Sequence, residues 1–98
     1  MASHVLTIVN NSVSKKPIFV YSFNWSENNY QEGHLIAYGD KQPYWFQEQY
    51  YYNLIGRVQG SQDLYAEGLF HLKEDKEVGF HEYFEVKIPP SPHFPPKQ

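Results

Sequence analysis

The chain has 98 residues, of which 41% are hydrophobic and 18% aromatic, and it carries a formal net charge of −3 and no cysteine. This length fits one domain, and the hydrophobic share excludes a largely disordered chain. The lack of clustered Lys and Arg argues against a nucleic-acid partner. The apolar runs are too short to cross a bilayer as a helix.

Val5 to Val9 is predicted to be a strand, and Asn10 to Lys16 a polar turn. Pro17 to Trp25 follows as the clearest strand, because nearly all its residues are β-formers. One face of it carries aromatic side chains only, namely Phe19, Tyr21, Phe23 and Trp25. This pattern predicts either a central strand of a sandwich or an exposed aromatic ladder.

The rest of the chain repeats short β-rich runs and polar breaks. A polar loop is expected over 26–33, and turns at 39–40, 60–63 and 73–76. Further strands are predicted over 34–38, 44–46, 50–58, 64–72 and 79–88. Six to eight short strands at this spacing predict an all-β fold, a small antiparallel β-sandwich or a partly open barrel with almost no helix.

The predicted core includes Val20, Ile36 and Leu54, because each lies in an apolar run. We expect residues 1–90 to form a single domain. Residues 89–98 include five prolines, so 91–98 are expected to form an extended tail that the fold does not need. Because a core of this size is only marginally stabilising, a homodimer is among the expected states.

No set of residues has the spacing that catalysis or metal binding requires. The five histidines, at positions 4, 34, 71, 81 and 93, include no zinc-type pair. His71 and His81 flank the 73–76 turn and could form an ordinary cross-strand pair. The carboxylates of the C-terminal half fit a solvated acidic face better than a glycosidase pair. We therefore predict no enzyme activity, no metal site and no cofactor.

Two observations bear on where the protein is made. The N-terminus has no basic start followed by an apolar stretch and a small-residue cleavage site. The absence of cysteine favours a reducing compartment, so cytoplasmic synthesis without a signal peptide is expected. The acceptor-type tripeptides Asn10-Asn11-Ser12 and Asn24-Trp25-Ser26 are accordingly interpreted as chance.

Aromatic residues gather near predicted loops and strand ends. Rings in such places can stack on sugars or lie at a membrane interface, although Trp25 and Trp45 could instead be core residues. Three consecutive tyrosines, Tyr50 to Tyr52, cannot all point inward from a strand. The aromatic set therefore indicates a binding surface more than a reaction centre.

The segment from Leu6 to Trp45 resembles the small single-domain insecticidal proteins of Pseudomonas that act on corn-rootworm larvae. The resemblance is carried by Thr7, Asn10, Ser12, Pro17-Ile18-x-Val20, Trp25, Gly39, Lys41-Gln42 and Trp45. The turn at 13–16 is two residues longer here, and the loop after Trp25 differs by about one residue. The resemblance implies a non-enzymatic protein that is made without a leader and acts outside the producing cell, on insect midgut cells, after release or ingestion.

The resulting hypothesis is an insecticidal or defence protein that binds a cell-surface receptor or glycan of the insect gut. The alternative is a lectin-like module that binds glycans without toxicity. The predicted binding residues are Trp25, Tyr30, Lys41, Gln42, Tyr44 and Trp45. Of these, Tyr30 and Tyr44 are expected to be the probes that disturb folding least.

Overall fold

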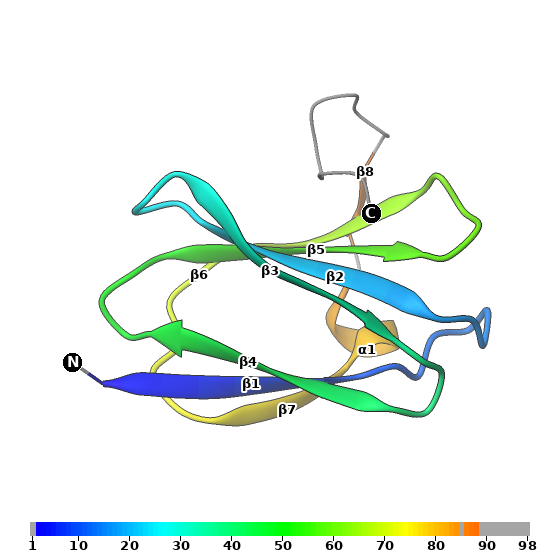
Figure 1. Cartoon of the computed structure of the whole chain (residues 1–98), viewed down its shortest axis with the longest axis horizontal. Coiled ribbons are helices and arrows are strands. Elements are labelled where there is room, and N and C mark those ends of the chain that lie inside the picture. Colours follow the sequence, from blue (N-terminus) through cyan, green and yellow to red (C-terminus); the bar gives the residue numbers. More distant parts are fainter. Residues whose placement is uncertain (1, 85, 89–98) are drawn as a thin grey trace.

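The computed structural model describes residues 2–84 and 86–88, of which 32, 67–69 and 86–88 are described by their backbone alone. These residues form eight strands and one short helix (Figure 1). The elements are β1 (Ser3–Val9), β2 (Ile18–Asn24), β3 (Asn29–Ile36), β4 (Lys41–Gln47), β5 (Tyr52–Val58), β6 (Leu64–Phe70), β7 (Lys76–Gly79), α1 (Phe80–Tyr83) and β8 (Val86–Ile88).

The strands form two sheets that face each other, the larger one above the smaller in Figure 1. The larger sheet has the order β3-β2-β5-β6-β8, and all its neighbours are antiparallel. The smaller sheet has the order β4-β1-β7, in which β1 runs antiparallel to β4 and parallel to β7. The predicted all-β sandwich is therefore confirmed, and a parallel pair is added to the expected antiparallel pattern.

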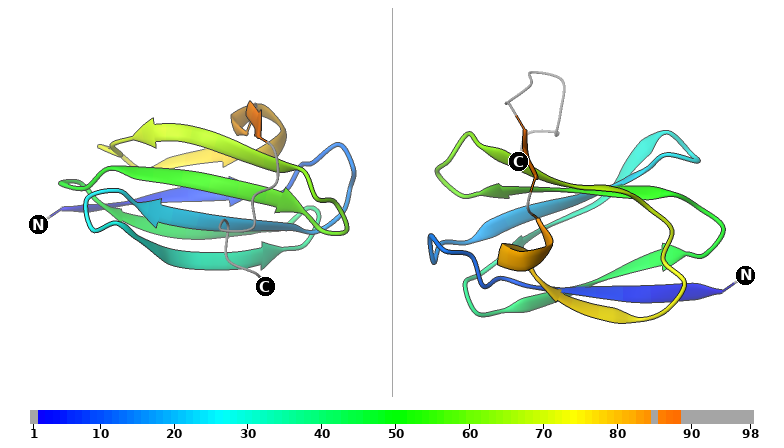
Figure 2. Two further views of the ribbon diagram at one scale, coloured as in Figure 1. Left: turned by 90° about the horizontal axis from the view of Figure 1, so that it is seen from above. Right: turned by 180° about the vertical axis from the view of Figure 1, so that it is seen from behind.

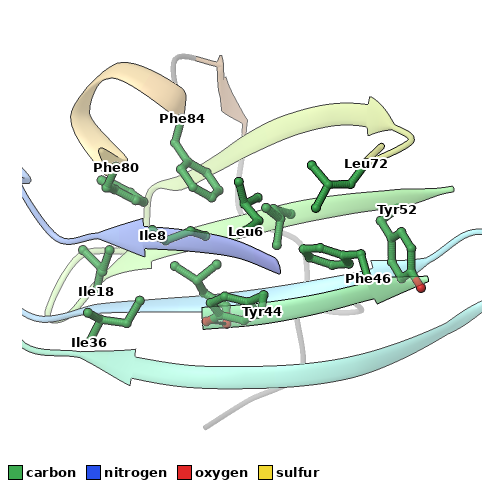
Figure 3. Close-up of a cluster of buried hydrophobic side chains, with 12 residues drawn as sticks. Leu6, Ile8, Ile18, Ile36, Tyr44, Phe46, Tyr52, Leu72, Phe80 and Phe84 are labelled. Atoms are coloured by element: carbon green, nitrogen blue, oxygen red, sulfur yellow. Dashed lines mark hydrogen bonds between the residues drawn. The ribbon is translucent and has the colours of Figure 1, made fainter. Parts of the chain in front are cut away.

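Alternate side chains of both sheets point into one core, which Figure 3 shows. Leu6 and Ile8 of β1 face inward from the smaller sheet, together with Tyr44 and Phe46 of β4. The larger sheet contributes a matching set, which includes the predicted core residues Val20, Ile36 and Leu54. Their exposed fractions of 0%, 2% and 0% confirm that prediction.

The helix α1 covers one open side of the sandwich between the two sheets (Figure 2, right). The Phe84 N–H donates to the Phe80 carbonyl at 3.0 Å, and the two rings stack with centroids 4.7 Å apart. Phe80 lies over Gly56 of β5, where a Cβ atom would come within 2.5 Å of the ring. Glycine at position 56 therefore makes the space into which the helix packs.

The prediction of one strand over 79–88 is wrong. The chain instead leaves β7 beside β1, turns through α1 and joins β6 as β8 in the other sheet. Because β6 and β7 lie in different sheets, His71 and His81 do not face each other across a hairpin. The His71 ring contacts Tyr51, whereas the His81 N–H donates to Asn11 Oδ1.

Asn10 and Asn24, which begin the two glycosylation-type tripeptides, are both fully buried. In the folded protein neither side chain is accessible for modification. The predicted proline-rich tail, 91–98, lies outside the described residues. Within the described part of the chain, no helix has the length and apolarity that a membrane-spanning helix requires.

Candidate functional site

The six predicted binding residues do not form one site, because the sandwich places them on different faces. Trp25 follows β2 and lies on the outer face of the larger sheet. Trp45, opposite Val5, lies on the outer face of the smaller sheet. Both indoles are largely exposed, at 56% and 63%. One small ligand therefore cannot contact both tryptophans.

Tyr44 does not lie on the surface. Its neighbours along β4 alternate between exposed and buried, and Tyr44 is on the inward side with an exposed fraction of 0%. The hydroxyl donates to the Val20 carbonyl at 2.8 Å, across to the other sheet. Tyr44 is thus a core residue, and its replacement by Ala would disturb folding rather than probe binding.

The other predicted residues of β4 lie at its beginning. Lys41 is exposed and forms a surface ion pair with Glu77 of β7, at 3.3 Å. Gln42 is half-buried, and its Nε2 donates to the Pro43 carbonyl at 3.4 Å. On this face the cross-strand partner of Trp45 is Val5.

The larger sheet carries a continuous aromatic surface, which we call the outer aromatic face. Its rings meet edge to face across β2 and β3, with centroid separations of 4.5 to 6.1 Å. Glycine at position 33 of β3 admits one of these rings, since a Cβ there would come within 2.8 Å of Phe19. The members are Phe19, Tyr21, Phe23, Trp25 and Tyr30.

Trp25 borders a hollow of about 310 Å³ in this face. The hollow lies between β2, β5 and β6 and is lined by Phe23, Trp25, Asn53, Ile55 and Ala66. Its lining is almost entirely apolar, with the Asn53 amide as the polar group. The small Ala66 opposite Ile55 leaves the space that a larger residue would fill.

The Trp25 indole is held in place although it is exposed. The Nε1–H donates to Asn53 Oδ1, and the Trp25 backbone N–H donates to the Tyr51 carbonyl at 2.8 Å. Ser26 Oγ in turn accepts a hydrogen bond from the Tyr51 N–H at 3.1 Å. A fixed indole with an open face loses little conformational entropy when a ligand stacks on it.

The phenols of Tyr21 and Tyr30 are neutral at physiological pH. Burial raises the pKa of Tyr21, and the nearby Arg57 charge only partly offsets this. Burial also raises the pKa of Tyr30, with a smaller contribution from Tyr21. The face therefore combines apolar rings with uncharged hydroxyl groups, a combination that suits ligands with apolar patches and hydroxyls.

A second hollow, of about 320 Å³, was not predicted from the sequence. It lies where α1 meets the 12–14 turn, with Tyr65, Phe80 and Phe84 among its lining residues and Ser12 and His81 as polar ones. These segments are far apart in the chain, so no local pattern could have indicated it. The outer aromatic face did have a signal, the alternation of aromatic residues from 19 to 25.

Among the described residues, no group of three or more His, Cys, Asp or Glu side chains is placed to hold a metal ion. No family model, no curated protein and no solved structure matches the chain. The resemblance to the Pseudomonas insecticidal proteins therefore stays a prediction. Support for a function has to come from the geometry of the candidate site.

Proposed function

We propose that this protein is a non-enzymatic insecticidal or defence protein that binds a receptor on insect midgut cells through the outer aromatic face. The observation that carries the proposal is the Trp25 hollow. It joins an exposed, fixed indole to an apolar depression and one amide. Binding sites for small groups commonly consist of an apolar depression and a few placed polar groups.

The outer aromatic face is favoured over the surface around Trp45 because of its extent. Trp25 is one of several connected rings, and tyrosine and tryptophan are the residues that carry much of the energy of protein interfaces. Trp45 lies opposite Val5 on the smaller sheet. Scattered single hydrophobic residues of that kind are common on surfaces that bind nothing.

The two tryptophans supply a matched pair of variants to test this proposal. Trp25→Ala and Trp45→Ala each remove one largely exposed indole, one from each face. We expect fluorescently labelled Trp25→Ala protein to bind beetle-larval midgut sections at least about ten-fold more weakly than the parent. Trp45→Ala should bind like the parent.

A feeding assay on the same larvae completes the test, with melting temperatures to confirm that both variants fold. Toxicity of the parent and of Trp45→Ala, with loss in Trp25→Ala, is the expected result. If the parent neither binds gut tissue nor harms larvae, the insecticidal function is wrong. If Trp45→Ala alone loses activity, the function stands but the site lies on the smaller sheet.

The second candidate is a lectin-like module that binds glycans without toxicity. It is supported by the pairing of the Trp25 indole with the Asn53 amide, since sugar rings stack on indoles and their hydroxyls bond to amides. A glycan screen combined with the feeding assay separates the candidates. Glycan binding that depends on Trp25 without any harm to larvae would favour the lectin-like module.

A further inference from the structure

Arg57 is the one arginine of the chain, and it lies on the outer aromatic face. On β5 the residues Leu54 and Gly56 point into the core, so Arg57 points outward, where it is opposite Phe19 of β2. Its charge also acts on the Tyr21 phenol, where it partly offsets the rise in pKa that burial causes. The arginine is therefore part of the same surface as Trp25.

This guanidinium has no ion pair and no hydrogen bond with any of the described residues, although the chain has 11 acidic residues and only eight basic ones. It is also half-buried beside aromatic rings, where it loses part of its contact with water. A partly desolvated guanidinium gains most from a carboxylate or sulfate, which it binds with two parallel hydrogen bonds. The surface thus offers a positive group that the described part of the protein does not neutralise.

We infer that the outer aromatic face binds an acidic oligosaccharide, whose carboxylate or sulfate group pairs with Arg57 while a sugar ring stacks on Trp25. The inference rests on the proposed function, because it names the ligand of that same surface. Phe19, opposite Arg57, and Trp25 are six residues apart along one strand direction, or roughly 20 Å. A ligand that contacts both groups is therefore an extended chain of several sugar units.

Isothermal titration of the full chain with three related probes tests this inference. The probes are a chondroitin sulfate hexasaccharide, its desulfated form, which keeps the carboxylates, and the desulfated form with its carboxylates methyl-esterified. We expect the parent to bind at least one acidic probe about ten-fold or more tightly than the neutral probe, as one charge-assisted pair allows. The desulfated probe distinguishes a carboxylate from a sulfate as the recognised group.

Three variants assign the preference to Arg57. Arg57→Gln should bind the acidic and neutral probes within about two-fold of each other, and Arg57→Lys should retain only part of the preference, because lysine lacks the planar fork. Lys73→Gln removes one exposed positive charge from another part of the molecule and should bind like the parent. Unchanged melting temperatures will show that the variants fold.

Three results would overturn the inference. If the parent binds acidic and neutral probes equally, or if Arg57→Gln keeps the preference, Arg57 does not recognise an acidic sugar. In either case, binding of the neutral probe leaves the proposed function intact. If no probe binds but Arg57→Gln loses binding to gut sections, the ligand is an acidic protein surface and not a glycan. Failure of the parent to bind gut sections would instead contradict the proposed function itself.

Discussion

Asn10 shows how a single side chain joins two loops of this fold. It is fully buried, and its Nδ2 donates to the carbonyls of Lys16 and Ile36 at 2.8 and 2.9 Å. Its Oδ1 accepts a hydrogen bond from the Ser12 N–H at 3.1 Å. Asn10 begins a glycosylation-type tripeptide, but its role is structural. Its burial shows this role, and the tripeptide does not.

Replacement of Asn10 should be costly because it removes the donor to the buried Ile36 carbonyl and one of two donors to the Lys16 carbonyl. We expect Asn10→Ala to lower the free energy of unfolding by about 2–4 kcal/mol. Asn10→Asp should also destabilise the protein, since it keeps the acceptor but loses both donated bonds. Urea unfolding measures the change, with the exposed Asn29→Ala as the control. Equal midpoints for Asn10→Ala and Asn29→Ala would contradict this role.

At the scale of elements, β2 was predictable and its neighbours were less so. Its run of β-formers predicted both ends of the strand to within one residue. One face of the strand enters the core and the other carries the exposed aromatic ladder, as the two expectations had it. Ile18 and Val20 enter the core, and the aromatic ladder faces outward. The beginning of β3 was missed because Asn29 to Gly33 is polar apart from Tyr30, and its pairing with β2, which includes a register shift, is made by the backbone.

The segment after β7 shows a different limit of the sequence pattern. Phe80 and Phe84 both lie in the stretch predicted as one strand, 79–88, whereas they are four residues apart on a helical turn. Residues four apart lie on the same side of a strand and also on the same side of a helix. A short apolar run with this spacing therefore does not distinguish a strand from a helix. What decides is the space over Gly56, which depends on tertiary structure.

The packing of α1 on β5 gives a prediction about that space. Gly56→Ala would place a Cβ within 2.5 Å of the Phe80 ring, so we expect a loss of about 1–3 kcal/mol. In a Phe80→Ala background, where the ring is absent, the same change should cost clearly less. A double-mutant cycle by urea unfolding measures the difference. Equal costs in the two backgrounds would show that the ring does not set the requirement for glycine.

Because of its buried phenols, the larger sheet should lose stability at alkaline pH. Burial raises the pKa of Tyr21, Tyr30 and Tyr52 above the ordinary 10.0. The unfolded phenols therefore release protons first as the pH rises. The contribution of the neutral phenols to the free energy of unfolding is fully present below about pH 10. It is lost as the pH rises from there through the folded-state pKa.

Urea midpoints between about pH 8 and pH 11 should accordingly fall at the upper end. Tyr52→Phe should flatten part of this decrease, because it removes one of the three titrating groups. Midpoints that stay constant over the range would contradict the assignment of these phenols as buried.

At the scale of the whole molecule, the fold class followed from the sequence. The placement of the predicted binding residues on two different faces did not. The spacing of short strands indicated a sandwich, and alternation showed which side chains share a face of one strand. Neither shows which strands share a sheet, so Trp25 and Trp45 were expected in one site although they lie on opposite faces. Tyr44 was expected at the surface because the pattern of β4 does not reveal which of its two sides meets the other sheet.

The central claim is that the protein binds its target through the outer face of the larger sheet. Hydroxyl-radical footprinting of the protein on beetle midgut brush-border vesicles tests it directly, because the chain has two tryptophans with nearly equal exposure, 56% and 63%. Both indoles should be oxidised in the free protein. On the vesicles we expect Trp25 to be protected while Trp45 is oxidised as before. Protection of Trp45 with Trp25 still oxidised would contradict the account.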